Sequence, residues 1–204
     1  GPRVVTPVAG EPGLSVRAIP RSAFSTNEKW RNPMEDYEDL TDCGLSEELE
    51  AELLAAQREC VFQWTNRDGE PFGVIMSFLY TGGKFWLTAA ERRARIRAVR
   101  RDPRVAITVT STGSGMRSGL TASYKGIATV HDDASVKDWF YPAFCTKLRP
   151  DDESARAAFQ NHLDSPDRVV IEVDPTYKLS FDSRLLWQRS PDALPEHRRR
   201  ELGL

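Results

Sequence analysis

The residues most able to do chemistry in this sequence are arginines that crowd into one short stretch. They lie between Glu91 and Arg104, where only Glu91 and Asp102 oppose them, in a chain whose formal net charge is −2. They are Arg92, Arg93, Arg95, Arg97, Arg100, Arg101 and Arg104. Guanidinium groups bind phosphate and carboxylate oxygens through paired hydrogen bonds. The stretch is therefore a candidate anion site, and a solvated basic surface is the alternative for any such run.

The elements expected around these arginines favour the anion site. The stretch is predicted to form a strand over 84–88, a helix over 89–101 and a second strand, with Pro103 marking the end of the helix. Arg92 and Arg93 then fall near the start of the helix, where backbone N–H groups are unpaired and the helix dipole is positive. Cations there cost stability unless an anion lies among them, so this corner suits a phosphate group.

The rest of the chain reads as short strands joined by turns. Strands are expected over 60–65, 72–80, 105–110 and 120–131, with a last hairpin that joins 168–173 to 177–181. The 72–80 run is apolar on both faces, so it is expected at the centre of a sheet. Gly126 inside its strand indicates a bulge or a close backbone approach.

Helices are expected to interrupt these strands at three further places. The first is a helix over 46–58, capped by Ser46. The second begins with Asp132 or Asp133 as its cap, and the third covers 151–163. Strands that are adjacent in sequence exclude a doubly wound parallel sheet, which needs a crossover between each pair. Antiparallel hairpins of this length suggest a closed or split barrel.

Composition narrows the class of protein. The chain is 204 residues long and 40% hydrophobic, which is enough for one domain with a core. The weak net charge and the lack of a nucleic-acid-binding motif argue against a nucleic-acid partner, and no apolar run approaches the ~20 residues of a membrane span. Three widely spaced cysteines fit free thiols in a reducing cytosol. No secretory apolar segment follows the N-terminus, so a cytoplasmic location is expected.

Side chains that could catalyse a reaction by themselves are not apparent. His131, His162 and His197 are scattered, and no local signature pairs them with a nucleophile or with a metal. No catalytic or metal-binding residue is assigned. These features fit a cofactor enzyme, in which the protein supplies position and electrostatics. Aromatic residues that could border a planar ring, or equally belong to the core, are Phe78, Trp86, Trp139 and Trp187.

The order of several motifs resembles a known family. An aromatic strand ends in Thr88, the arginine helix follows, and Arg-Arg-Asp-Pro-Arg-Val over 100–105 leads into a β-branched strand. The 68–71 turn (Asp-Gly-Glu-Pro) and the 124–128 strand (Tyr-Lys-Gly-Ile-Ala) fit the same pattern. Over residues 45–187 the sequence resembles the split-barrel flavin-binding family of pyridoxamine 5′-phosphate oxidase and the deazaflavin (F420)-dependent reductases. The resemblance implies a mainly β fold with α, an antiparallel split β-barrel with peripheral helices.

The resemblance also implies where a cofactor would bind. Family members hold its phosphate with a Thr at the end of the third strand and with basic residues after it, which match Thr88, Arg95 and either Arg92 or Arg93. Family members usually have Lys at the position of Arg95, and Arg keeps the charge and adds a second hydrogen bond. The spacing from Thr88 is one residue longer than is common, so the choice between Arg92 and Arg93 stays open. In the family, main chain of the second strand and of the third strand meets the flavin ring, and the matching residues here are Val74, Ile75, Met76, Ser77 and Leu87. A tryptophan of the second subunit, Trp187 or Trp139, would complete the pocket.

Two departures from the family bear on the substrate. The usual pair of a small polar residue and Pro in the second strand is Val74-Ile75 here. The Arg-x-His type motif with which the true oxidase reads pyridoxal phosphate is not evident near the C-terminus. Oxidation of vitamin B6 is therefore not the expected reaction.

The function predicted from these features is that of a flavin-dependent oxidoreductase. It would transfer a hydride between FMN, or alternatively coenzyme F420, and a small organic substrate. The alternative is a non-catalytic protein of the same fold that binds or sequesters flavin or heme. The resemblance implies a homodimer with the cofactor at its interface, and neither nucleic acid nor membrane is expected as a partner. The expected organisation is a partly flexible N-terminal arm over 1–40, a split-barrel flavin-binding domain over 41–189 and a charged C-terminal tail over 190–204.

Overall fold

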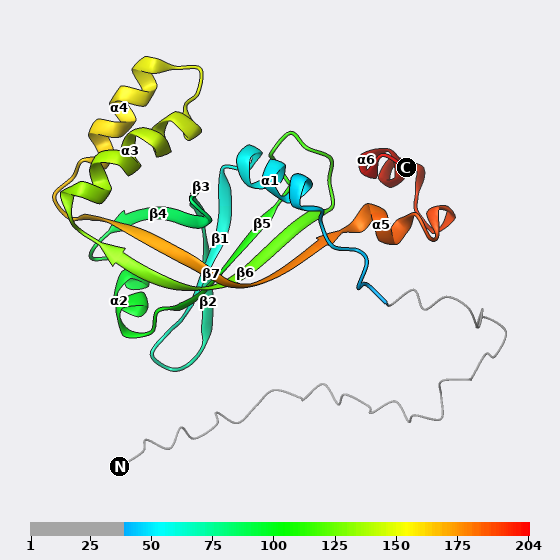
Figure 1. Cartoon of the computed structure of the whole chain (residues 1–204), viewed down its shortest axis with the longest axis horizontal. Helices are drawn as coiled ribbons and strands as arrows, with labels where there is room; N and C mark the ends of the chain where they lie inside the picture. The colour runs from blue at the N-terminus through cyan, green and yellow to red at the C-terminus, as the bar shows by residue number, and fades with distance from the viewer. Residues whose placement is uncertain (1–38) are drawn as a thin grey trace, which may run out of the picture. The chain divides into compact units, whose positions relative to one another are not determined.

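The computed structural model describes residues 39–204, and these form one sheet with helices around it (Figure 1). Its seven strands run in the order β2-β1-β5-β6-β7-β4-β3, and each neighbouring pair is antiparallel. The strands are β1 (Glu59–Thr65), β2 (Pro71–Ser77), β3 (Leu79–Thr81), β4 (Lys84–Ala90), β5 (Arg104–Thr110), β6 (Leu120–His131) and β7 (Arg168–Asp182). The sheet curls into a half barrel, so the predicted split barrel is confirmed.

Helices lie between these strands and after the last one. They are α1 (Glu47–Ala56), α2 (Ala94–Arg101), α3 (Ala134–Leu148), α4 (Glu153–Leu163), α5 (Ser183–Trp187) and α6 (Glu196–Leu202), with a 3-10 turn at Pro191–Ala193. The predicted N-terminal arm over 1–40 falls almost wholly outside the described residues, and the domain boundaries stay predictions. No helix in residues 39–204 is long and apolar enough to cross a membrane.

Local sequence signals set several of these boundaries as expected. The Ser46 hydroxyl accepts a hydrogen bond from the Leu49 N–H at the start of α1 (3.2 Å). Asp133, one of the two candidates, caps α3 by accepting from the Val136 N–H. In β6, the pairing with β7 shifts register between Lys125 and Gly126, as the glycine indicated. Caps and glycines act over a few residues, which is why sequence alone locates them.

The prediction of one central strand over 72–80 is wrong. The chain breaks at Phe78, so that β2 lies at one edge of the sheet and β3 at the other. Two of its large apolar side chains, Phe72 and Ile75, are 59% and 61% exposed. A strand that is apolar on both faces can lie at the centre of a sheet with both faces buried, or at an edge with one face that another chain covers. The periodicity of apolar residues is the same in both cases, so it could not separate them.

The predicted helix over 89–101 begins too early. Strand β4 continues to Ala90, because it pairs with β7 as far as Arg168, and the Glu91 N–H then donates to the Asp167 carbonyl. Arg93 is the N-cap residue of α2 and makes no side-chain capping bond. The first arginines of the stretch therefore precede the helix rather than lie in its first turn.

The predicted hairpin across Asp174 and Pro175 is also wrong. Residues 168–182 form one long strand, β7, which pairs with β6 from Val170 to Asp182. Pro175 is accommodated because β4 pairs with β7 only as far as Val173, which leaves an open edge beyond that point. A Pro next to an Asp normally marks a turn, and here the long β6 partner overrides that signal.

Two hydrophobic clusters hold these elements. The larger fills the curl of the sheet, with Phe62, Phe85 and Ile107 fully buried. The smaller lies under α3 and α4, where Phe140 and Leu163 pack against Val170 of β7. The predicted tail over 190–204 contains α6, whose Leu202 is 1% exposed. The second cluster fixes α3 and α4 against the end of β4 that carries Thr88.

Candidate functional site

A pocket of about 200 Å³ opens where the end of β4 meets α2, α4 and the start of β7. Its walls come from six elements, because β2 and α3 also contribute. The lining residues are Met76, Ser77, Thr88, Arg95, Phe144, Phe159, His162, Leu163 and Arg168. Four residues that the family resemblance implied, Met76, Ser77, Thr88 and Arg95, therefore lie around one cavity.

Two arginines give this pocket its charge. Arg95 comes from the first turn of α2 and Arg168 from the start of β7, and both side chains are half-buried. The Nε of each is buried with no hydrogen-bond partner in residues 39–204, and neither arginine forms an ion pair there. Burial lowers the pKa of Arg95, and the nearby charge of Arg93 lowers it further. Buried donors without partners cost free energy, so this arrangement fits an anion such as a phosphate group.

Thr88 holds its place by a backbone hydrogen bond. Its hydroxyl donates to the Val169 carbonyl (2.8 Å), across the pairing of β4 with β7. In this conformation the hydroxyl offers the pocket only its lone pairs. To donate to a phosphate oxygen, the O–H has to turn about the Cβ–Oγ1 bond, which a threonine hydroxyl does without moving the strand.

The pocket also contains residues that the sequence analysis did not select. Arg168 and His162 lie more than 60 residues beyond Arg95 in the sequence, and the β4–β7 pairing and the α3–α4 hairpin bring them close. The rings of Phe144 and Phe159, with centroids 6.2 Å apart, form the apolar wall. The only sequence signal near these residues was the β-branched run after Arg168. That run predicted a strand, but it did not predict which strand pairs with it.

Other predicted site residues do not line this pocket. Leu87 is fully buried on the opposite face of β4 from Thr88, as strand alternation requires. Val74 and Ile75 lie further along β2 than the residues at the pocket. Arg92 forms an exposed ion pair with Asp167 (3.7 Å). These assignments remain predictions about a bound cofactor.

Trp187 is far from the pocket of its own chain. The β7 residue opposite Thr88 is Val170, and α5 begins only after Asp182. At ~3.3 Å per residue, roughly 40 Å of strand separates them. Trp187 of one chain could reach this pocket only from a second copy.

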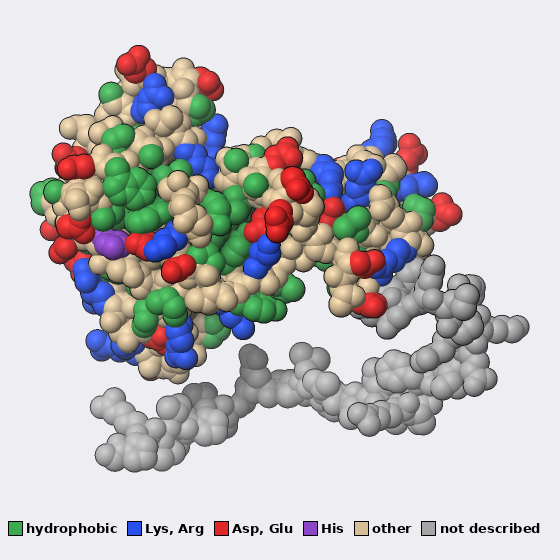
Figure 2. Space-filling model, viewed as in Figure 1, with side chains coloured by type: hydrophobic (Ala, Val, Ile, Leu, Met, Phe, Trp, Pro, Cys, Tyr) green, Lys and Arg blue, Asp and Glu red, His purple; other side chains and the backbone are tan. Residues whose placement is uncertain are grey.

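The outer arginines form a separate basic surface. Arg100 pairs with Glu91 (2.9 Å), Arg104 pairs with Asp102 (2.7 Å), and Arg101 donates to the Thr65 carbonyl. Figure 2 shows Lys and Arg side chains gathered at the lower left, over the region of α2. The two interpretations of the arginine stretch, an anion site and a solvated basic surface, thus apply to different arginines. Arg95 lies in a pocket, and these outer arginines lie on a solvated face.

Aromatic side chains continue from the pocket along the same face of β4. Trp86 precedes Thr88 by two residues, so both side chains lie on one face. Its ring meets that of Trp139 edge to face at a centroid distance of 4.7 Å and stacks on His131 at 6.0 Å. Trp86 is half-buried and Trp139 is 38% exposed. A planar group that extends from the pocket along β4 would meet an aromatic surface.

Comparison with known proteins gives the family. The model of the family described as Pyridoxamine 5′-phosphate oxidase matches residues 45–179. Among solved structures, a conserved hypothetical protein from Mycobacterium tuberculosis is 17% identical, with a TM-score of 0.61, 76% of this chain covered and 92% of that chain. An F420 reductase is 21% identical, with a TM-score of 0.52 and coverage of 66% and 98%.

A third solved structure extends the comparison to another kind of protein. HutZ, a heme storage protein from Vibrio cholerae, is 10% identical, with a TM-score of 0.51 and coverage of 67% and 94%. At these identities the structures show a shared fold. A search of curated proteins found no significant match. Since the family model covers well over half of the sequence, this chain belongs to the pyridoxamine 5′-phosphate oxidase family.

Proposed function

We propose that this protein is a flavin-dependent oxidoreductase that transfers a hydride between FMN and a small organic substrate, with F420 as the alternative cofactor. Membership of a flavin-binding family supports the cofactor class. The observation that carries the proposal is the pair of inward guanidinium groups, Arg95 and Arg168, whose buried Nε atoms lack partners. A dianionic phosphate would satisfy both groups and neutralise their charge.

The residues of the pocket have distinct roles in this proposal. Arg95 and Arg168 hold the phosphate from two sides, and the Thr88 hydroxyl turns to donate a third hydrogen bond. Phe144 and Phe159 exclude water behind it, which strengthens the charged contacts. Flavin supplies the hydride chemistry when it is bound, so the pocket needs no catalytic side chain.

A homodimer is part of the proposal, and the outer face of the sheet supports it. Strand register sets Ile75, Val61, Thr108, Ser123 and Leu179 side by side across five strands. The row is apolar or small, and Ile75 and Leu179 at its ends are 61% and 63% exposed. Exposed apolar rows of this kind mark association surfaces. Dimerisation through this face would cover them and bring a second copy to the cofactor site.

Cofactor titration tests the proposed function. The full chain, stripped of any bound cofactor, is titrated separately with FMN, FAD, F420 and heme, and absorbance and fluorescence report binding. We expect saturable binding of FMN or F420 at one site per chain, followed by reduction and reoxidation by an organic acceptor. Binding of heme alone, or no saturable binding, would contradict the proposal. A bound flavin that never cycles would favour the alternative, a non-catalytic binding protein.

A further inference from the structure

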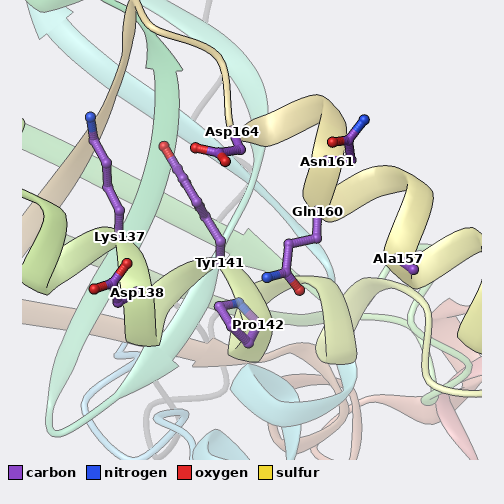
Figure 3. A pocket seen from close by; sticks show the side chains of 8 residues that line it. All are labelled: Lys137, Asp138, Tyr141, Pro142, Ala157, Gln160, Asn161 and Asp164. Atoms are coloured by element: carbon purple, nitrogen blue, oxygen red, sulfur yellow. The ribbon is translucent and has the colours of Figure 1, made fainter.

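Tyr141 of α3 is a buried polar residue to which nothing above gives a role. It is 4% exposed, its hydroxyl oxygen is buried, and it belongs to the hydrophobic cluster under α3 and α4. Figure 3 shows its side chain extending from α3 away from Pro142, with the hydroxyl on the side of Asp164 at the end of α4. The phenol is therefore held inside the protein, and its polar end needs a partner there.

Strand register places this hydroxyl next to the phosphate pocket. Val170 lies in the same cluster and is the β7 residue directly opposite Thr88 of β4. The Thr88 hydroxyl lies beside the Tyr141 hydroxyl, and the Arg168 guanidinium is close enough to act on it electrostatically. Thr88 and Arg168 line the pocket, whereas Tyr141 does not. Tyr141 thus stands behind the pocket wall and can act on a bound phosphate only through a residue of that wall.

The direction of a hydrogen bond between the two hydroxyls follows from the surroundings of Thr88. The single proton of the Thr88 hydroxyl is donated to the Val169 carbonyl (2.8 Å), so Thr88 can only accept from Tyr141. The Tyr141 phenol keeps its proton at neutral pH, because burial raises its pKa more than Thr88 and the Arg168 charge lower it. In residues 39–204 this contact is not a well-formed hydrogen bond, so Tyr141 remains a donor in need of a better acceptor.

We propose that Tyr141 positions Thr88 for the phosphate of the cofactor: the Tyr141 hydroxyl donates to the Thr88 oxygen while the Thr88 hydroxyl donates to the phosphate. When the Thr88 O–H turns away from Val169, its lone pairs turn with it, and one of them becomes the acceptor that Tyr141 needs. Two hydrogen bonds in series polarise each other, so Thr88 becomes a stronger donor. The inference rests on the proposed function, because it needs a phosphate beside Arg95 and Arg168.

Flavins with and without a phosphate separate this positioning role from a role in packing alone. The full natural chain and Tyr141→Phe are titrated with FMN and with riboflavin, which has the same ring and sugar chain but no phosphate, and flavin fluorescence measures both affinities. We expect Tyr141→Phe to weaken FMN binding about three- to tenfold, the effect of one neutral hydrogen bond, and to leave riboflavin binding unchanged. Equal losses for the two flavins, or full FMN affinity in the folded variant, would overturn the inference.

A double-mutant cycle tests whether Tyr141 acts through Thr88. Thr88→Val removes the hydroxyl that Tyr141 is proposed to orient and keeps a β-branched side chain in β4. In the Thr88→Val background, Tyr141→Phe should therefore change FMN affinity less than about twofold, because the two residues work as one unit. If Tyr141→Phe costs the same three- to tenfold in that background, the two hydroxyls act independently and the proposed positioning is wrong.

Tyr124→Phe is the matched control for the loss of a buried phenol hydroxyl. Tyr124 is also 4% exposed, but its hydroxyl donates to Glu50 (2.6 Å) in the larger cluster, so the ratio of FMN to riboflavin affinity should stay that of the natural protein. Thermal unfolding verifies that each variant is folded.

The same titrations separate failure of the inference from failure of the proposed function. A natural protein that binds FMN no more tightly than riboflavin has no phosphate site, and both ideas fall together. A natural protein that prefers FMN, with an unchanged preference in Tyr141→Phe, keeps the phosphate site and removes only the role of Tyr141.

Discussion

Burial separates Arg95 from the other arginines of the 91–104 stretch. Arg92, Arg100 and Arg104 each face a carboxylate at the surface, where an ion pair contributes about 0–1 kcal/mol. Arg95 instead turns into a pocket with Arg168 and finds no carboxylate there. Identical side chains that are a few residues apart thus do different things, and the difference lies in their surroundings.

Lys147 is a second half-buried cation, and its titration should be visible in the pH dependence of the stability of the protein. Its Nζ donates to the Leu54 carbonyl (2.9 Å) and lies 3.9 Å from the centre of the Phe78 ring. Burial lowers the pKa of Lys147 to about 8 from its ordinary value of 10.5. Between these two values the unfolded chain holds a proton that the folded protein has released. The contribution of Lys147 to the free energy of unfolding should therefore increase as the pH rises from 8 to 10.5. The increase is at most about 1.4 kcal/mol per pH unit.

The variant Lys147→Met isolates this contribution. Chemical denaturation of the natural protein and of the variant at pH 7, 8, 9 and 10 gives two stability curves. Their difference should favour the variant most at pH 7 and shrink above pH 8, because the natural protein no longer buries a charge there. Lys125→Met, at an exposed side chain of β6, is the control and should give a flat difference. A flat difference for Lys147→Met as well would contradict the burial argument.

Among the elements, the pairing of β6 with β7 decides most of the fold. The pair is the longest in the sheet, and its register shift at Gly126 lets β7 curl over the core. A Cβ at Gly126 would lie 2.7 Å from the Val173 side chain and 2.8 Å from the Asp174 carbonyl oxygen. The glycine is therefore required for close contact of two strands rather than for an unusual φ angle.

Gly126→Ala should destabilise the protein for this reason. Overpacking of a close backbone contact costs about 1–3 kcal/mol, so the midpoint of chemical denaturation should fall. Gly44→Ala is the matched control, because its Cβ would meet the Ser180 hydroxyl at an ordinary 3.5 Å. Equal stability of the two variants would show that the β6–β7 contact relaxes freely.

The accuracy of the sequence-based predictions follows from the range of the forces behind them. The 120–131 strand and the caps at Ser46 and Asp133 depend on neighbouring residues, and these predictions are confirmed. The 72–80 strand and the 168–182 segment depend on which strands lie beside them, and those predictions are wrong. Pairing between distant strands overrides local turn and periodicity signals.

The same contrast holds for the pocket. Thr88 and Arg95 are close in sequence, and family resemblance was enough to select both. Arg168 and His162 reach the pocket through β7 and α4, so their place depends on tertiary packing that no local pattern encodes. Trp187 was selected for its type, and about 40 Å of strand keeps it from the pocket of its own chain.

For the whole molecule, the outer face of the sheet predicts self-association. A charge placed at Leu179, which is 63% exposed, should leave the protomer folded and break a dimer that buries this side chain. Leu179→Glu should raise the dimer dissociation constant at least about tenfold, because burial of a leucine contributes ~1.5–3 kcal/mol. Light scattering across a dilution series measures the change.

Leu40→Glu provides the control for this dimer test. Leu40 is 43% exposed and lies outside the row that runs from Ile75 to Leu179. The Leu40 variant should keep the mass of the natural protein at every concentration. If the natural protein is a monomer throughout the series, or if Leu179→Glu dimerises as well as Leu40→Glu, the proposed face is not an interface.

The central claim is that Arg95 and Arg168 together hold the phosphate of the cofactor, and FMN affinity in three arginine variants tests it most directly. Arg95→Ala and Arg168→Ala each remove a charge-assisted contact of about 1.5–3 kcal/mol, so each should weaken FMN binding about tenfold or more. Arg97→Ala removes the same charge from the exposed face of the same helix and should change the affinity little. Thermal unfolding of each variant verifies that it is folded. Full FMN affinity in the folded Arg95 and Arg168 variants, or equal weakening in Arg97→Ala, would contradict the account.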